Sequence, residues 1–364
     1  MSLLATPKSS ATAVAVLGSS WPETGLESVR ACPACGNTPR ELLHKGMRDR
    51  VFFCAPGEWD LYRCAKCETG YLDPRPSAAT IALAYSRYFT HGSASDVGAT
   101  PRSSWRRHRL SQRNAYLNAH YDYQLAAGGQ RSPRWLSAKR RQRFDKFVCF
   151  LRYPGKGARV LDIGCGNGRV MMQLRSVGWH VSGVEPDPKS AAQAREAGLD
   201  VRVGQLEPGA WPERYFDAIT MNHVIEHLHD PIGILRTCAQ LLKPGGAISI
   251  ATPNLRSRGH EIFGRDWLHL DTPRHLVLFS PNSLRKCLEA SGFRPEPDLR
   301  LEPTATEIFR RSMHIRLGYD PIGEKPSMPI HARLRASWLA RKANWVARAN
   351  PDLAESVILI ATRN

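Results

Sequence analysis

The segment VLDIGCGNGRV, at residues 160–170, places glycines at 164, 166 and 168 directly after a β-branched, apolar run. A glycine-rich loop between a strand and a helix lets a ligand approach the backbone closely. The G-x-G-x-G spacing differs from the G-x-G-x-x-G of dinucleotide-binding loops. Asp162 stands two residues before the first glycine, and its carboxylate would repel a pyrophosphate but attract a cation. The loop is therefore expected to hold a positively charged ligand rather than a phosphate.

Glu185 ends a second expected strand about 20 residues after this loop, where a carboxylate can accept hydrogen bonds from two ribose hydroxyls. NAD would use the same carboxylate, so Glu185 alone leaves the ligand open. The loop spacing, the carboxylate of Asp162 and the lack of a second nucleotide-binding half all argue against NAD. An adenosyl ligand with a cationic tail fits these features better, and S-adenosylmethionine has that form.

Four of the nine cysteines form two C-x-x-C pairs, CPAC at 32–35 and CAKC at 64–67. Two such pairs can supply the thiolates of a tetrahedral zinc site, and four thiolates leave no position open for catalysis. The expected ligands of a structural Zn²⁺ in a zinc-ribbon-like unit are Cys32, Cys35, Cys64 and Cys67. Gly36 suits the tight turn after the first pair, whereas Glu68 stands at the equivalent position after the second. A redox pair or a set of unrelated thiols is the alternative.

The segment NHVIEHLHDP, at 222–231, concentrates side chains that can move protons, namely His223, Glu226, His227 and His229. Methyl transfer to a hydroxyl or to an acidified C–H needs a base that titrates near neutral pH, and histidine is the natural candidate. Glu226 and His227 are adjacent, so their loop must orient them. Hydrogen bonding that only holds the loop is the main alternative, and a metal site made from the three histidines is less favoured.

The elements that must position these residues fall into two units. From about residue 131, helical and strand patterns alternate, which is typical of a parallel sheet covered by helices. The residues singled out above follow expected strands, at the edge where open α/β sheets bind ligands. The expected organisation is a flexible tail at 1–28, a zinc-ribbon-like unit at 29–77, a helical linker or lid at 78–130 and a catalytic domain at 131–364, with an insertion at 255–280.

The composition is that of a soluble globular protein, with 42% hydrophobic and 23% charged residues among 364. No apolar run approaches the ~18 residues of a membrane-spanning helix. We therefore expect a cytoplasmic protein whose membrane contact would be peripheral. The net charge of +18 is compatible with an anionic partner such as nucleic acid. The basic clusters at 102–113, 131–146 and 331–348 are interleaved with apolar residues at helical spacing, which favours solvated helix faces over binding to an anionic partner.

Four motifs carry a family resemblance: VLDIGCGNG, GVEPD, FDAITMNHVIEHLHDP and LLKPGGAISIATPN. Their order and spacing resemble the class I S-adenosylmethionine-dependent methyltransferases over about residues 135–300 and the terminal strand. The four-cysteine unit and the segment WLHLDTPRHLVLFS are similar to a bacterial subgroup with a zinc-ribbon head. The resemblance implies an α/β fold with a Rossmann-like, doubly wound, seven-stranded sheet. It also implies an acceptor that is a small molecule, a sugar or a lipid-linked metabolite.

The resemblance assigns roles by position. The methionine end of the cofactor would contact Asp162, Gly164, Cys165, Gly166 and Gly168. The ribose would contact Glu185, Pro186 and Asp187, and the adenine would contact Gly204 and Gln205. The sulfonium would lie beside Asn222 and His223. His227 would be the catalytic base, and Glu226 would orient it or hold the acceptor. The acceptor would be bound by Trp267, His269, Asp271, Arg274 and His275. The alternative for Asp271 and Arg274 is a structural ion pair within the insertion.

Two other functions stay open on the sequence alone. An RNA- or protein-directed methyltransferase would use the zinc ribbon and the basic clusters to grip a macromolecule. The motifs of DNA-base methyltransferases, an NPPY-type loop or a PC nucleophile, are missing where the fourth strand ends in MNHV. A non-catalytic zinc-ribbon binding protein is the minor alternative. It is disfavoured because all four cofactor motifs are intact, as an active enzyme requires.

Overall fold

The computed structural model describes residues 20–86, 104–127, 136–302, 305–322 and 328–364. Most of the tail expected at 1–28 lies outside these residues, as does much of the linker or lid expected at 78–130. None of the helices in the described ranges has the length and apolarity that a membrane crossing requires.

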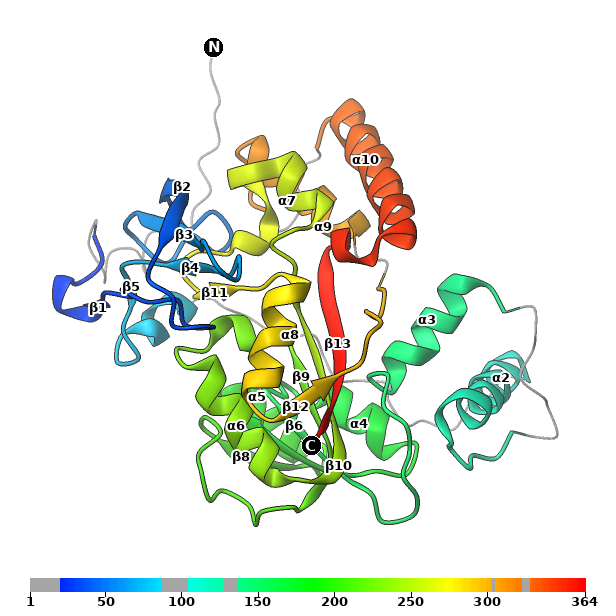
Figure 1. Ribbon diagram of the computed structural model, residues 1–364. Coiled ribbons are helices and arrows are strands. Elements are labelled where there is room, and N and C mark those ends of the chain that lie inside the picture. Colours follow the sequence, from blue (N-terminus) through cyan, green and yellow to red (C-terminus); the bar gives the residue numbers. More distant parts are fainter. Residues whose placement is uncertain (1–19, 87–103, 128–135, 303–304, 323–327) are drawn as a thin grey trace.

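A seven-stranded sheet forms the centre of the molecule, in the order β12-β13-β10-β9-β6-β7-β8 (Figure 1). Its strands are β6 (Arg159–Ile163), β7 (His180–Glu185), β8 (Asp200–Val203), β9 (Phe216–Asn222), β10 (Leu242–Pro253), β12 (Phe293–Pro295) and β13 (Ser356–Arg363). Strands β6 to β10 are parallel, and β13 is antiparallel to both of its neighbours. The expected Rossmann-like, doubly wound sheet of seven strands is confirmed.

Helices cover both faces of this sheet (Figure 1). The α-helices of the described residues are α2 (Ser104–Tyr121), α3 (Ala138–Phe147), α4 (Arg169–Arg175), α5 (Pro188–Glu196), α6 (Pro231–Leu241), α7 (Arg258–Phe263), α8 (Pro281–Ala290), α9 (Ala305–Arg316) and α10 (Ile330–Ala349). Short 3₁₀ turns are η1 (Glu23–Gly25), η2 (Ile81–Tyr85), η3 (Ile225–His227), η4 (Gly264–Asp266), η5 (Leu268–Leu270) and η6 (Pro351–Leu353).

The two-residue period of strand β6 explains why both faces are covered. Leu161 packs in the cluster that contains Leu235 of α6 and Leu284 of α8. Its neighbour Val160 packs in a different cluster, with Leu174 of α4. Because successive strand residues point to opposite faces, an apolar run here needs a helical layer on each side. The carboxyl edge between these layers is where the loops after β6, β7 and β9 meet.

The amino-terminal unit adds a second, antiparallel sheet in the order β11-β4-β3-β2. Its strands are β2 (Arg40–Met47), β3 (Trp59–Cys64), β4 (Gly70–Leu72) and β11 (Val277–Leu278), and a separate pair joins β1 (Leu26–Glu27) to β5 (Arg75–Pro76). Strand β11 belongs to the expected acceptor insertion, far along the chain from the other three. The insertion therefore completes the sheet of the amino-terminal unit.

The two units share one apolar core. The buried side chains of Trp59 and Tyr71, from β3 and β4, belong to the same cluster as Phe279 and Leu284. The zinc-ribbon-like unit is thus packed directly on the carboxyl edge of the large sheet (Figure 1).

Candidate active site

The loop between β6 and α4 holds its three glycines in the left-handed region, with φ of 67°, 55° and 79° at Gly164, Gly166 and Gly168. A Cβ at Gly164 would lie 2.5 Å from Val224 Cγ2, and one at Gly168 would lie 2.2 Å from Leu199 Cδ1. A Cβ at Gly166 would meet no atom within 4 Å. Packing within the protein therefore requires glycine at the first and third positions, and the open space for a ligand lies beside the second.

Two buried carboxyl groups adjoin this loop. Asp162 accepts a hydrogen bond from Thr220 Oγ1 at 2.6 Å. Burial raises the pKa of Asp162 to about 7, and the charge of Glu185 adds to the increase while the Thr220 bond opposes it. Glu185 accepts from the N–H groups of Gly166, at 2.7 Å, and Asp187, at 2.9 Å. Burial also raises the pKa of Glu185. A cation or a hydroxyl donor in the open space would stabilise both carboxylates.

The residues around Glu185 form the rim of the same space. Asp187 caps helix α5, because its side chain accepts from the N–H groups of Lys189 and Ser190. The N–H of Gly204, after β8, donates to the carbonyl of Glu185 at 3.0 Å. Pro186 and Gln205 are exposed, and Cys165 is buried between the first two glycines. The loops after β6, β7 and β8 are thus brought together as the sequence predicts.

A carboxylate–imidazole pair follows strand β9. The carboxylate of Glu226 is fully buried, and its Oε1 lies 3.2 Å from Nδ1 of His223, whose side chain is 46% exposed. Its Oε2 accepts from Thr252 Oγ1 at 2.9 Å. His223 has a φ of 54°, which turns it back over the loop, and its N–H donates to the carbonyl of Ala251. The imidazole paired with Glu226 is therefore that of His223 and not that of the adjacent His227.

His223 and Glu226 each stabilise the charged form of the other. Burial favours the neutral form of His223, but the hydrogen bond to Glu226 and its negative charge outweigh burial and raise the pKa of His223. Burial likewise opposes ionisation of Glu226, yet the bond to His223 and the charge of that imidazole lower the pKa of Glu226 to about 2. Glu226 is thus ionised at neutral pH, and His223 is a stronger base than an ordinary histidine. Asn222, half-buried just before it, donates a long contact of 3.9 Å to Cys149 Sγ.

His227 lies in a different environment. Its Nδ1 is 3.0 Å from the carbonyl oxygen of Arg274 and 2.9 Å from the hydroxyl of Tyr85. Its ring meets that of His275 edge-on, with centroids 4.7 Å apart, and Nδ1 of His275 donates to the carbonyl of His269 at 2.7 Å. Burial, followed by the nearby His275, lowers the pKa of His227 to about 4. Hydrogen bonds thus hold the imidazoles of His227 and His275 in fixed orientations, and His227 stays neutral. We call the surface formed by these two side chains the imidazole wall.

Two further residues of the insertion extend this wall. The ring of His269 lies 5.9 Å from that of His223 and 5.2 Å from that of Trp267, centroid to centroid. Nδ1 of His269 is buried and has no hydrogen-bond partner within the described part of the chain. Trp267 is itself buried, and its indole N–H donates to Glu355 at 3.1 Å. A polar group of a bound molecule would satisfy the unpaired nitrogen of His269.

The side chain of Arg274 is engaged in contacts within the protein. Its side chain is fully buried and forms ion pairs with Asp49, at 2.6 Å, and Asp271, at 2.7 Å. It also donates to the carbonyl of Ala84 and stacks on the ring of Phe52, 4.5 Å from the centroid. The structural ion pair with Asp271 is therefore the alternative that the geometry favours over acceptor binding. Because Asp49 belongs to the amino-terminal unit, the ion pairs of Arg274 link that unit to the insertion of the catalytic domain.

The four cysteines converge on one point. Sγ of Cys32 lies 3.6 Å from Sγ of Cys67, and Sγ of Cys35 lies 3.6 Å from Sγ of Cys64. Tetrahedral ligands with Zn–S bonds of about 2.3 Å would stand roughly 3.8 Å apart, so the spacing fits zinc and is much too long for a disulfide. The two turns are alike, because N–H groups of Gly36 and Glu68 donate to the carbonyls of Cys32 and Cys64. Glu68 adopts φ of 63° even without being glycine.

In the described ranges a second group could bring three ligand atoms together. One atom each from Glu226, His227 and His275 lies within 4.8 Å of the others. The carboxylate in this group is already engaged by hydrogen bonds with His223 and Thr252. His229 is not part of it, since its Nε2 donates to the carbonyl of Pro76 at 2.9 Å.

Comparisons with known proteins agree with this arrangement. Residues 136–297 match a family model described as a methyltransferase domain. The ubiquinone biosynthesis O-methyltransferase of Maricaulis maris is 34% identical over 198 residues, which are 50% of this chain and 78% of that protein. The chain belongs to the S-adenosylmethionine-dependent methyltransferases. The enzyme of the same name from Rhizobium leguminosarum is 34% identical over 151 residues, 38% of this chain and 60% of the relative.

Among solved structures, an S-adenosylmethionine-dependent methyltransferase from Mesorhizobium loti aligns with 20% identity and a TM-score of 0.40, over 61% of this chain and 98% of that one. The family model and both curated relatives leave much of this methyltransferase unmatched, and the four cysteines lie outside residues 136–297. The zinc-ribbon-like unit is thus an addition to the matched domain.

The sequence did not single out two residues that this methyltransferase brings to the site. Tyr85 and Asp49 lie 142 and 225 positions from their partners His227 and Arg274. Neither stands in a recognisable motif, and only the folded contact between the two units reveals them. Thr220 and Thr252 were also missed, although each lies in the strand that precedes a predicted site segment.

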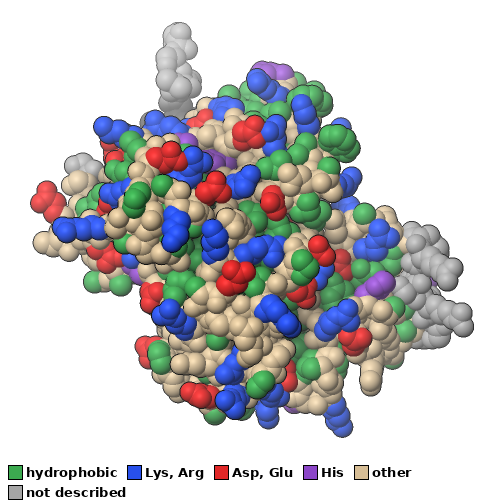
Figure 2. Space-filling view, in the orientation of Figure 1, with side chains coloured by type: hydrophobic (Ala, Val, Ile, Leu, Met, Phe, Trp, Pro, Cys, Tyr) green, Lys and Arg blue, Asp and Glu red, His purple; other side chains and the backbone are tan. Residues whose placement is uncertain are grey.

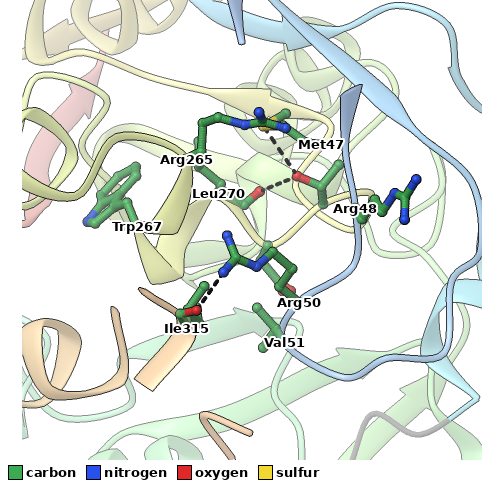
Figure 3. A pocket seen from close by; sticks show the side chains of 10 residues that line it. Met47, Arg48, Arg50, Val51, Arg265, Trp267, Leu270 and Ile315 are labelled. Carbon is green, nitrogen blue, oxygen red and sulfur yellow. Dashed lines mark hydrogen bonds between the residues drawn. The ribbon is translucent and has the colours of Figure 1, made fainter. Parts of the chain in front are cut away.

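A pocket opens where the amino-terminal unit meets the insertion (Figure 3). It is lined by Met47, Arg48, Arg50, Val51, Arg265, Trp267, Leu270, Asp271, Thr272 and Ile315. Arg50 donates to the carbonyl of Ile315 and to Asp266, which closes the floor of the pocket. Trp267, which lines the pocket, lies with its ring 5.2 Å from that of His269, centroid to centroid.

Proposed function

We propose that this enzyme transfers the methyl group of S-adenosylmethionine to a hydroxyl oxygen of a small aromatic acceptor of the phenol or quinol class. The pairing of His223 with the buried carboxylate of Glu226 carries this proposal, because it creates a base beside a loop that favours a cation. The curated relatives support the acceptor class, since they are named as O-methyltransferases of ubiquinone biosynthesis.

The cofactor supplies an electrophilic methyl group on a sulfonium. Its methionine end would be held at Asp162 and along the glycine loop, at Gly164, Cys165, Gly166 and Gly168. Glu185 would accept from the ribose hydroxyls, with Pro186 and Asp187 beside it and with Gly204 and Gln205 flanking the adenine. Asn222 and His223 would border the sulfonium. The open space beside Gly166 supports this placement.

Asp162 should make cofactor binding depend on pH. Its carboxyl has a pKa of about 7 in the free protein, so it is increasingly neutral below pH 7 and loses its attraction for a cation. We expect the affinity for S-adenosylmethionine to fall between pH 7 and pH 5.5 by up to about tenfold per pH unit. The ammonium group of the ligand stays charged over this range. Isothermal titration calorimetry across the range measures the effect.

Two variants separate this effect from general damage. Asp162→Asn should bind weakly and should lose the fall in affinity that begins near pH 7, because the group with that pKa is gone. Glu185→Ala should lower the affinity for S-adenosylmethionine by about 10- to 100-fold, the loss expected for a charged hydrogen-bond acceptor. In this variant the affinity should still fall as the pH is lowered. A pH slope that persists in Asp162→Asn would refute the assignment of Asp162.

His223 is the proton acceptor in this proposal. Its Nε2 would take the hydroxyl proton of the acceptor, and the carboxylate of Glu226 would stabilise the resulting imidazolium through Nδ1. His227, which the family resemblance nominates as base, has a lowered pKa and a Nδ1 turned to a backbone carbonyl. We therefore place His227, with His269 and His275, in the wall that positions the acceptor.

The pocket at the junction of the two units would receive the part of the acceptor that does not react. It combines apolar side chains with three arginines, of which Arg265 donates to the carbonyl of Gly46 and is not ion-paired within the described residues. Such a lining suits an aromatic ring or chain with an anionic substituent.

The proposed acceptor class can be tested directly. Purified enzyme, S-adenosylmethionine and a panel of soluble phenols, ortho-quinols and deoxysugars would be incubated, and products would be identified by mass spectrometry. Methyl ethers of the phenols or quinols support the proposal. Methylation of sugars alone, or on nitrogen or carbon, would contradict it.

The four cysteines would hold a structural Zn²⁺. The matched sulfur spacing and the two equivalent turns support this assignment. Four thiolates leave the metal no open position, so it contributes to folding and not to chemistry. Trp59 and Tyr71 of the same unit are part of the core that it shares with the catalytic domain.

Metal analysis of the folded enzyme is expected to give one zinc per chain. Cys64→Ser should lose that zinc, because three thiolates and a hydroxyl bind it far more weakly. Cys54→Ser is the matched control, since Cys54 is equally buried and lies outside the group of four. Zinc retained by Cys64→Ser, or lost by Cys54→Ser as well, would contradict the ligand set.

A further inference from the structure

Helix α10 (Ile330–Ala349) has an inner face made of small side chains. Its buried residues are all alanines, at positions 332, 336, 340, 343 and 347. They let the helix pack closely against the rest of the domain, where it contacts α9. Four large apolar side chains of α10 lie outside this inner face, and their position requires another explanation.

These large side chains form a stripe on the outer face. Ile330 is 64% exposed, Leu334 63%, Trp338 60% and Trp345 68%. Steps of four, four and seven residues place them along one side of the helix. Apolar residues scattered singly over a surface are ordinary, whereas a continuous exposed stripe marks a site of interaction. Among the described residues ten large hydrophobic side chains are exposed, and four of them lie on this one helix.

The same helix is strongly basic. It carries Arg333, Arg335, Arg341, Lys342 and Arg348 and has no acidic residue between 330 and 349. None of these five forms an ion pair within the described part of the chain. Lys342 Nζ lies 5.6 Å from the ring centre of Trp338. Basic and apolar side chains cover the region that α10 occupies at the upper right (Figure 2).

This combination selects among the partners such a stripe could have. A second copy of the chain would bring two rows of arginines against each other, which costs energy. A nucleic acid would use the cations but would leave Ile330 and Leu334 in water. An anionic lipid surface satisfies both features, because apolar side chains enter the acyl boundary while arginine and lysine meet the headgroups. We propose that α10 docks the enzyme on a membrane that contains anionic lipids.

The position of α10 gives this docking a direction. The helix leads through η6 into β13, whose first residue, Ser356, pairs with Pro253 at the carboxyl end of β10. The docking helix and the candidate active site therefore lie at the same edge of the sheet (Figure 1). Docking would bring that edge toward the lipid surface. The inference does not depend on which acceptor is methylated.

Vesicle co-sedimentation of the full-length, zinc-loaded enzyme tests the proposal. Vesicles of phosphatidylcholine alone are compared with vesicles that also contain phosphatidylglycerol, at low and at high salt. We expect binding to the anionic vesicles only, and weaker binding at high salt because screening acts on exposed charges. The double variant Trp338→Ala/Trp345→Ala should weaken the partition coefficient by at least about tenfold, since two large apolar side chains no longer enter the lipid.

Trp105→Ala is the matched control. Trp105 is 61% exposed on the basic helix α2, with the guanidinium of Arg109 over its ring at 4.4 Å. It should leave vesicle binding unchanged. Equal loss in this variant, equal binding to neutral vesicles, or no vesicle binding at all would overturn the proposal. Two other results would also overturn it: a dimer seen in light scattering that the double variant abolishes, or binding to nucleic acid instead of vesicles that the double variant abolishes.

Discussion

Replacing His223 by asparagine is expected to lower kcat by about 10²- to 10⁴-fold, the contribution of a positioned general base. Asparagine tolerates the left-handed backbone that His223 adopts, with φ of 54°, so the loop should keep its shape. Turnover with labelled cofactor and a methylated product measures the loss. His227→Ala should cost less, because His227 positions the acceptor in this account.

The pH dependence of kcat distinguishes a base from a merely structural histidine. A base must be neutral, so the rate should fall as pH drops through the pKa of His223, which lies above the ordinary value. Glu226→Gln removes the charge that raises that pKa and should move the fall to lower pH while reducing the rate. His180→Asn, at an exposed histidine that begins β7, should match the unmodified enzyme. An unshifted profile in Glu226→Gln would remove His223 from its catalytic role.

The second large effect concerns stability. Arg274→Leu should lower the free energy of unfolding by about 3–5 kcal/mol, because it leaves charges buried without a partner. The side chains of Asp49 and Asp271 are 1% and 10% exposed, so water cannot replace the lost guanidinium. Urea unfolding of the zinc-loaded enzyme, followed by tryptophan fluorescence, measures the change.

An exposed arginine provides the control for this stability measurement. Arg48 pairs with Glu58, at side-chain exposures of 71% and 56%, and Arg48→Leu should cost no more than about 1 kcal/mol. Adding Asp271→Asn to Arg274→Leu should recover part of the loss, since one of the two unpaired charges disappears. Equal stability of Arg274→Leu and Arg48→Leu would contradict the role of Arg274 as the tie between the two units.

The sequence predicted the features that depend on local pattern. The alternation of strands and helices gave the doubly wound sheet, and the order of the four motifs gave the family. The loop glycines were located correctly, but packing against Val224 and Leu199 explains Gly164 and Gly168 better than ligand contact does. Glu68 adopts the turn that Gly36 adopts, because the carbonyl of Cys64 fixes it.

What the sequence could not give are contacts between distant segments. Glu226 lies on the 3₁₀ turn η3 and meets His223, which precedes that turn with φ of 54°, and not the adjacent His227. That turn depends on tertiary packing and leaves no periodic signal. The ion pair of Arg274 with Asp271 was among the alternatives, but its second partner, Asp49, was hidden because it belongs to the other unit. Buried polar side chains of this kind follow from the folded arrangement, not from their neighbours in the chain.

The most direct test of the central claim uses methyl-labelled S-adenosylmethionine, the purified enzyme and an extract of its own cells. The reaction would be separated into nucleic-acid, protein, organic-soluble and small aqueous fractions, with Asp162→Ala as the control. We expect label in the organic-soluble or small aqueous fraction, and none with the control variant. Label in the nucleic-acid or protein fraction would instead show that a macromolecule is the acceptor and that the small-molecule proposal is wrong.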